Sequence, residues 1–363
     1  MSILIKPDID FIRELKKASP ELKECMQCGN CSAVCTLSPE NRPFPRKEMI
    51  WASWGLSDKL MASPDIWLCH QCGDCSAYCP RGVKPADVLS KIRQNTYRYY
   101  ARPKILGKIL DNPLLLPVAV AIPVVIIAAI IFAAGTFHIP EGTVNYSAFF
   151  PHKWLNISFT AITLTVIAFT ITGLLDFLKN LKNHFPGNPE KNSVFKSLLS
   201  LRKEIMFHSN FSKCGTQKSR KTAHLMVFYG FILLLLVTLY AIIAVITGDY
   251  PLSFLSPAKI TGNIAAVLLT CGLAIMIFNR LTDKINYGKS TYTDWLFLVS
   301  LLLLTLSGVF VEVARFQNWH WAYHIYFAHL VLVWFIVIYT PYTKFGHFIY
   351  RIAAQLYTKN RLD

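Results

Sequence analysis

Charged residues are scarce in this chain of 363 residues: Asp, Glu, Lys and Arg make up only 16% of it, whereas hydrophobic residues make up 53%. A soluble protein of this length would carry about a quarter charged residues. Six long segments contain no charged residue at all, and crossing the hydrocarbon of a bilayer takes about 20 apolar residues. The sequence therefore predicts six transmembrane helices. They are expected at 114–134, 154–175, 222–247, 260–279, 295–311 and 321–343.

The N-terminus lacks the apolar run of a secretory signal peptide, because charges of both signs are mixed within its first 20 residues. Residues 1–105 stay polar to mixed throughout. We therefore expect 1–105 to form a domain that remains in the cytoplasm, followed by a transmembrane domain over 106–363.

Cysteine is nearly missing from the membrane part. Eight of the ten cysteines fall between Cys25 and Cys79, and only Cys214 and Cys271, which we interpret as structural, lie beyond. A secreted disulfide framework would be small and would lack long apolar segments. Two tight, matching groups of thiols indicate metal binding in a reducing compartment.

The two groups repeat one motif. Residues 25–35 (CMQCGNCSAVC) and 69–79 (CHQCGDCSAYC) both read C-x2-C-x2-C-x3-C. In bacterial two-cluster ferredoxins with this pattern, the fourth cysteine of each run binds the other cluster. A zinc site takes four ligands from two pairs and leaves the third cysteine of each run without a role. The spacing predicts two [4Fe–4S] clusters, one held by Cys25, Cys28, Cys31 and Cys79 and the other by Cys35, Cys69, Cys72 and Cys75.

Helical patterns surround these motifs. The apolar periodicity of 46–56 predicts a helix between the runs, and 85–97, with its early proline, predicts another after them. We therefore expect an all-α fold, in which an α-helical ferredoxin domain is followed by a six-helix transmembrane bundle.

Residues 25–95 resemble the iron–sulfur subunit of heterodisulfide reductases. The resemblance rests on the cysteine motif, on Asp65-Ile-Trp-Leu-Cys69 and on Cys79-Pro-Arg-Gly-Val83. It implies that the domain relays electrons to a flavoprotein or catalytic partner.

The net charge of +16 does not indicate nucleic-acid binding, because the basic residues follow membrane topology. The connections 179–221 and 280–294, with the tail from Lys344, hold seventeen Lys and Arg, against three in the alternate connections. Cytoplasmic loops carry the excess of positive charge. We therefore expect a multi-pass protein of the cytoplasmic membrane with both termini in the cytoplasm.

Histidine within a transmembrane span is costly, so each one is a functional candidate. His224 begins the third span, and His347 follows the sixth at a matching depth. His329 lies 18 residues before His347. Eighteen residues are five full helical turns, so both histidines are expected on one face about 27 Å apart, which suits two haems. His70 is expected to tune a cluster, whereas His184 and His208 are expected to be solvated.

The last four spans resemble the haem b subunit of respiratory nitrate reductases, most clearly through His329-Leu-Val-Leu and Tyr342-Thr-Lys-Phe-Gly-His347. The resemblance implies that His347 and His224 bind one haem b, and that His329 binds a second. The family's other ligand of that second haem falls here on Leu234, which is a departure. His138 and His152 are the alternatives, and we favour His152 because it adjoins the second span.

A quinone needs an apolar slot with a few polar groups that exchange protons at its carbonyls. Two places qualify: the outer face near Glu312, His320 and His324, and the cytoplasmic face near His224, Lys344 and His347. The outer face is slightly favoured, although Arg315 could simply pair with Glu312.

The two halves together resemble the membrane subunits of quinone-modifying oxidoreductase complexes. The resemblance implies two flavin-binding partners like the A subunit of heterodisulfide reductase. It also implies electron exchange between menaquinone and adenylylsulfate reductase in sulfur metabolism. The alternatives are a membrane module of another heterodisulfide- or sulfite-reductase complex, and a redox-sensing membrane anchor without enzymatic activity.

Overall fold

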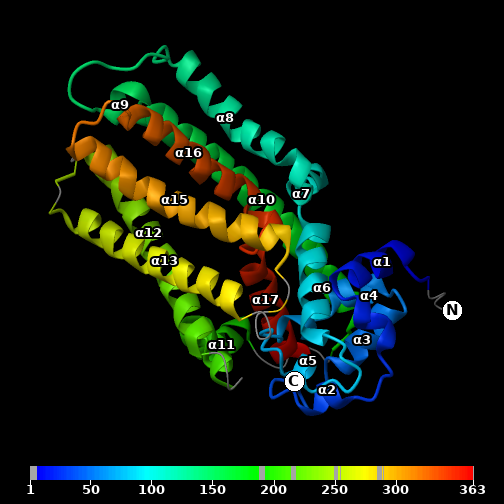
Figure 1. Ribbon diagram of the computed structural model, residues 1–363. Coiled ribbons are helices and arrows are strands. Elements are labelled where there is room, and N and C mark those ends of the chain that lie inside the picture. Colours follow the sequence, from blue (N-terminus) through cyan, green and yellow to red (C-terminus); the bar gives the residue numbers. More distant parts are fainter. Residues whose placement is uncertain are drawn as a thin grey trace.

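The computed structural model describes residues 6–187, 193–213, 218–248, 252–253, 255–283, 288 and 290–362. All regular secondary structure in these ranges is helical, so the predicted all-α class is confirmed. Figure 1 shows a bundle of long helices at one side and a group of short helices at the other, with both labelled chain ends near the short helices.

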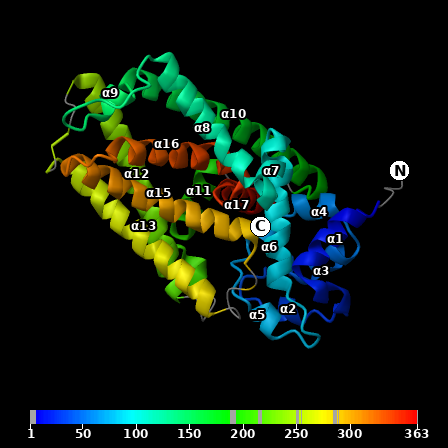
Figure 2. The same ribbon diagram turned by 45° about the horizontal axis from the view of Figure 1, so that its top comes forward.

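Six helices are long and apolar enough to cross a membrane, as the sequence predicts. They are α8 (Leu116–Ala133), α10 (His152–His184), α12 (Lys218–Thr247), α13 (Pro257–Thr282), α15 (Tyr292–Phe316) and α16 (Ala322–Tyr339). Helix α12 packs on α13, α13 packs on α15, and α15 packs on α16. Helices α8 and α10 both lie against α16 (Figure 2). Trp334 and Tyr339 of α16 are fully buried in this bundle.

Capping residues mark the starts of two of these helices. Ser256 caps α13 by accepting a hydrogen bond from the backbone N–H of Lys259. Thr291 and Asp294 form a reciprocal capping box at the start of α15. Such caps satisfy backbone donors that the first helical turn leaves free.

The N-terminal region contains short helices around the cysteine runs. They are α1 (Ile9–Ala18), α2 (Asn30–Ala33), α3 (Arg46–Ser53), α4 (Ser57–Ala62), α5 (Asp74–Ala77) and α6 (Pro85–Tyr100). Both helices that the pattern predicts, at 46–56 and from residue 85, are present as α3 and α6. Then α7 (Lys104–Asp111) leads into the bundle, and α9 (Tyr146–Phe149), α11 (Val194–Phe207) and α17 (Gly346–Tyr357) complete the set of helices used below.

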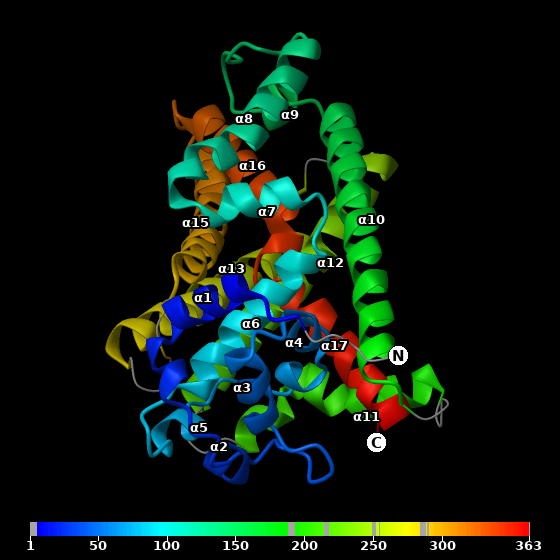
Figure 3. The same ribbon diagram turned by 90° about the vertical axis from the view of Figure 1, so that its right-hand side faces the viewer.

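The N-terminal region shares its hydrophobic core with two helices of the membrane half. The buried Trp67 stacks on Tyr350 of α17 at 5.8 Å between ring centroids and meets the edge of Phe177 of α10 at 6.3 Å. Gly173 of α10 lies against the Tyr100 carbonyl, where a Cβ atom would clash. Thus α10 runs past the predicted 154–175 span to His184, and its end becomes part of the core around the cysteine runs (Figure 3).

The sixth span is not one continuous helix, so one expectation was wrong. Helix α16 ends at Tyr339, a 3₁₀ turn covers Thr340–Tyr342, and α17 begins only at Gly346. Pro341 explains the break, because proline lacks an N–H donor and its ring clashes with the preceding turn. His329 and His347 therefore lie on separate helices, and the five-turn argument for a shared face fails.

Candidate metal centres and histidine pairs

The two cysteine runs repeat each other in backbone conformation as well as in sequence. Gly29 and Gly73 have φ values of 86° and 92° and directly precede α2 and α5. Gln27 and Gln71 also lie in the left-handed region, with φ values of 61° and 56°. Non-glycine residues rarely adopt this conformation, and it concentrates at functional sites.

Each of two hollows is lined by three cysteines of one run and one cysteine of the other run. One hollow is lined by Cys25, Cys28, Cys31 and Cys79, and a second hollow is lined by Cys35, Cys69, Cys72 and Cys75. The side chain of Asn30 ties the runs together by donating to the Tyr78 carbonyl at 2.6 Å. The structure thus brings together the two sets of four cysteines that the spacing predicts as ligands.

The pKa values of the thiols reflect the same grouping. Burial, with added repulsion from Cys25 and Cys28, raises the pKa of Cys31 to about 11. Burial also raises the pKa of Cys35 to about 11, and the added repulsion there comes from Cys69 and Cys72 of the other run. Metal binding releases such protons, because the thiolate is the ligand.

The spacing of these thiols suits a cluster better than one ion. Four sulfurs around one zinc ion lie about 4 Å apart, since zinc–sulfur bonds are about 2.3 Å. Within the described ranges, no three His, Cys, Asp or Glu side chains converge closely enough to hold a single metal ion. A [4Fe–4S] cluster is held by four thiolates, and each hollow is lined by four cysteines.

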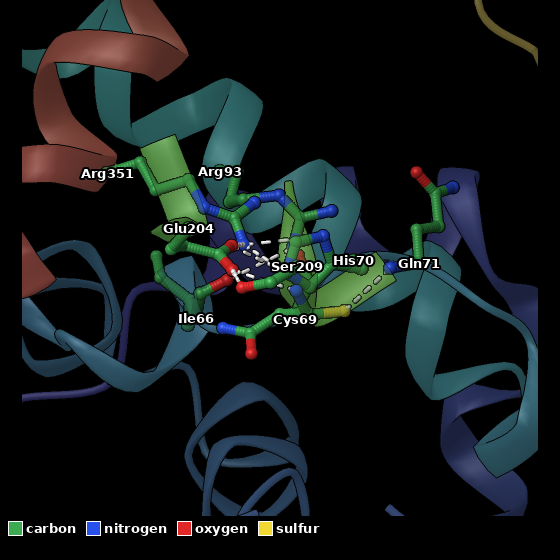
Figure 4. A network of polar contacts seen from close by, with 9 residues as sticks. Ile66, Cys69, His70, Gln71, Arg93, Glu204, Ser209 and Arg351 are labelled. Carbon is green, nitrogen blue, oxygen red and sulfur yellow. Dashed lines mark hydrogen bonds and ion pairs between the residues drawn. The ribbon is translucent and has the colours of Figure 1, made fainter. Parts of the chain in front are cut away.

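His70, between two cysteines of the second run, is buried in a polar network (Figure 4). Its Nε2 accepts a hydrogen bond from Arg351 Nη2 at 2.5 Å and lies 3.4 Å from Glu204 Oε1. Burial, followed by the charge of Arg351, lowers the pKa of His70 to about 3, so the ring is neutral. Glu204 comes from α11, in the segment that the sequence marks only as a basic loop.

His224 and His347 lie together at the end of the bundle nearest the cysteine runs. Their ring centroids are 6.3 Å apart, with ring planes at 87°. Two imidazoles on opposite sides of one metal ion have centroids about 6 Å apart, because metal–nitrogen bonds are about 2.0 Å. The Nδ1 of His347 donates to the Lys344 carbonyl, which leaves Nε2 for a ligand. The residues present therefore fit a haem b, which His224 and His347 would hold.

His208 is a neighbour of this pair that the sequence reasoning missed. It was expected to be solvated, yet its ring lies 4.7 Å from that of His224 and is half-buried. The expectation was wrong because α11 ends there in a left-handed turn, with φ of 50° at His208, and folds the ring back onto α12. No spacing signal in the basic segment could have shown this fold-back.

His329 faces α15. The Ser307 hydroxyl donates to the Leu304 carbonyl at 2.9 Å, so it accepts from His329 Nδ1, also at 2.9 Å. This assignment leaves Nε2 of His329 for a ligand. Gly308 lies beside the ring, since a Cβ atom there would come within 3.2 Å of it.

His329 faces away from the side of α16 that meets α10. Helix α10, which begins at His152, meets α16 at the contact of Phe159 with Trp334, whose centroids are 5.8 Å apart. Five residues separate His329 from Trp334, which corresponds to about 140° around the helix. The arrangement gives no support to His152 as the second ligand of a haem at His329. His138 lies in the connection that follows α8.

The quinone-site candidates have particular neighbours. Lys259 Nζ lies 3.0 Å from Glu312 Oε1, so the acid pairs with α13 rather than with Arg315. Lys344 Nζ lies 2.7 Å from Asp294 Oδ1.

At the opposite end of the bundle from the cysteine runs, His320 and His324 are exposed. They lie on either side of Trp321, at centroid distances of 5.7 and 5.1 Å.

Comparisons with known proteins agree with the cysteine geometry. Residues 21–83 match the family described as "4Fe-4S dicluster domain". Citrate utilization protein B of Escherichia coli is 25% identical over 284 residues, which cover 74% of this chain and 73% of that protein. No solved structure matches significantly. These findings support an iron–sulfur redox protein with helices apolar enough to span a membrane.

Proposed function

We propose that this chain is a membrane electron-transfer subunit that relays electrons between quinone, haem b and two [4Fe–4S] clusters. The observation that carries the proposal is that the second cysteine run lies next to the pair of His224 and His347. Arg351, one helical turn after His347, contacts His70 of the second cysteine run. The hollow lined by Cys69, Cys72 and Cys75 therefore lies beside the histidine pair, as successive electron carriers must.

Each part of the chain has one task in this relay. When bound, the clusters and haem supply one-electron carriers that the protein itself lacks. The eight cysteines would hold the clusters, and His224 with His347 would hold the first haem. His329 would hold a second haem, whose other ligand is unassigned. The buried Trp67 core fixes the cluster region against the bundle, so that the carriers keep one relative position.

The exit for electrons is the first hollow. Cys28 is exposed there, and the neighbouring Met26 and Tyr78 are 58% and 65% exposed. Clustered exposed apolar side chains mark interaction surfaces. We propose two flavin-binding partners like the A subunit of heterodisulfide reductase on this cytoplasmic side, and adenylylsulfate reductase in sulfur metabolism as the eventual destination.

A second candidate follows from the relative found by comparison. Its printed name concerns citrate utilization, and the alignment of 284 residues is far longer than the cluster region, so it extends into the membrane helices. In this candidate the same relay serves a flavoprotein that acts on a small carboxylic acid. The two candidates differ in the electron partner alone.

Anaerobic purification in detergent tests the relay itself. We expect about eight iron and eight acid-labile sulfide in the cluster region, together with b-type haem. A menaquinol analogue should reduce the haem and then the clusters. Stoichiometric zinc, or the absence of haem, would contradict the proposal, whereas cofactors that quinol cannot reduce would indicate a redox-sensing anchor. Co-purified partners would separate the sulfur and carboxylic-acid candidates.

A further inference from the structure

The second cysteine run is held by an arginine from a membrane helix. Arg220 belongs to the first turn of α12, and its Nη1 donates to the Gln71 carbonyl at 2.8 Å. Four residues later the same helix carries His224. Residues four apart lie on one helix face, so the arginine and the histidine point the same way. The cysteine loop is thus tied to the helix turn that presents one histidine of the pair.

A second arginine does the same from the other histidine helix. Arg351 lies four residues after His347 on α17, and it donates to His70. Its guanidinium lies 3.6 Å from Glu204, and the two side chains are only 19% and 11% exposed. Charged groups this well buried keep their geometry, because separating them leaves an uncompensated charge.

The first cysteine run provides an internal comparison. Its left-handed Gln27 has the same place in the motif as Gln71, and its carbonyl accepts from Arg46 Nε at 2.9 Å. Arg46 is local, since it belongs to α3 between the two runs. The corresponding contact to Gln71 comes from the membrane bundle instead. The two runs therefore share one support, an arginine on the glutamine carbonyl, supplied by different parts of the chain.

Further positive charge lies around the second run, as Arg46 and Arg81 do around the first hollow. Arg93 of α6 donates to the Cys69 carbonyl at 3.3 Å, which adds a third arginine to Arg220 and Arg351. Reduction adds negative charge to a cluster, and neighbouring positive charge in a partly buried site favours the reduced form.

We propose that Arg220 and Arg351 are positioning residues that fix the second cysteine run against the helix turns of His224 and His347, and that their charges raise the reduction potential of the cluster held there. This inference rests on the proposed function for the presence of cluster and haem. It goes further by assigning the link between them to two residues outside both ligand sets.

The test compares Arg220→Gln and Arg351→Gln with Arg46→Gln in the full-length protein. EPR-monitored redox titration gives the potential of each cluster, and hydrogen exchange gives the protection of each cysteine loop. Arg220→Gln and Arg351→Gln should shift the second cluster to a more negative potential and speed exchange around Gln71. Arg46→Gln should act around Gln27 and on the first cluster. Arg351→Lys keeps the charge but not the hydrogen-bond geometry. Its second cluster should therefore have a potential close to that of the wild type, whereas its loop around Gln71 should still exchange faster.

Unchanged potential and exchange at the second run in both Gln variants would overturn the inference. A variant that fails to fold is replaced by its Lys counterpart, whose loop should still exchange faster than that of the wild type. Exchange at Gln71 can be measured whether or not haem is bound. Absence of haem from the wild type would therefore count against the proposed function. Hydrogen exchange at Gln71 would still test whether the two arginines hold the second cysteine run.

Discussion

The imidazole rings of His224 and His347 lie 6.3 Å apart although 123 positions separate them in the chain. His224 lies in the first turns of α12 and His347 in the first turn of α17, so two helix starts converge on one point.

His347→Ala should abolish the haem proposed at this pair, because it removes one of the two imidazoles that would hold it. Reduced-minus-oxidised optical spectra and haem extraction measure the loss. His208→Ala is the matched control, since the ring of His208 lies 4.7 Å from that of His224 but is not a proposed ligand, and this variant should retain full haem content. Loss of haem in the control with retention in His347→Ala would reverse the ligand assignment.

Cys79→Ser should remove or convert the cluster of the first hollow and leave the other cluster intact. Cys35→Ser should do the opposite. The reason is the crossed lining of the two hollows. EPR of the reduced variants, with iron counting, checks both. A cluster lost from the hollow of Cys69, Cys72 and Cys75 in the Cys79 variant would show that each run binds its own cluster.

Glu48 should make stability depend on pH. Burial raises the pKa of this carboxyl to about 8, with Asp65 also raising it and Lys47 opposing the rise, while Ser63 donates to it at 3.4 Å. Between the unfolded pKa of about 4.5 and the folded pKa, the folded state keeps a proton that the unfolded state releases, so the free energy of unfolding falls as pH rises. At about 1.4 kcal/mol per pKa unit, the fall across this range is on the order of 5 kcal/mol.

Glu48→Gln should flatten this dependence. Denaturation midpoints in detergent at several pH values between about 5 and 8 would show a smaller slope than in the wild type. Glu24→Gln is the control, because Glu24 is solvent-exposed with Arg81 and should leave the slope unchanged. An equal slope in wild type and Glu48→Gln would contradict the assignment.

Glu312→Gln tests the outer quinone site. The carboxyl pairs with Lys259, and a neutral amide loses both that charge and the capacity to exchange protons with a quinone carbonyl. Quinol oxidation should fall about tenfold or more, as expected for loss of an acid–base group. Lys259→Met breaks the same ion pair but leaves the carboxyl, so it should cost less. An unaltered rate in Glu312→Gln would place the quinone near Lys344 and His347.

Topology can be checked with reporters. A periplasm-dependent reporter fused after Asp363 should be inactive, and the same reporter inserted in the connection at Gly142 should be active, because the charge bias predicts that both chain ends lie in the cytoplasm. The reverse result would invert the membrane orientation and place the cysteine runs outside.

The membrane helices and the cysteine pairing could be predicted from the sequence because each depends on one local pattern. Charge-free length alone marks a span, and the x3 spacing before Cys35 and Cys79 alone points to the crossed arrangement. The end of the helix before Pro341 could also have been predicted from the sequence, since proline rarely continues a helix. The prediction ran a single helix through it because apolar composition continues to Thr343.

The contacts between the cysteine region and the membrane helices could not be predicted from the sequence. The extension of α10 to His184 and the fold-back of His208 depend on tertiary packing that no periodicity records. A weak signal did exist: Arg220 and Arg351 each stand four residues from a candidate ligand histidine. Basic residues near membrane ends are common, however, so that spacing gains meaning only once His70 and Gln71 are seen to be their acceptors.

The core around Trp67 has a consequence for biogenesis. Synthesis delivers the eight cysteines first and Tyr350, which stacks on Trp67, almost last, after all six apolar helices. Chains emerge from the ribosome at about 5–20 residues per second, so the thiols wait through most of translation before their surroundings can close. The core around Trp67 therefore cannot close until the last apolar helix has been made.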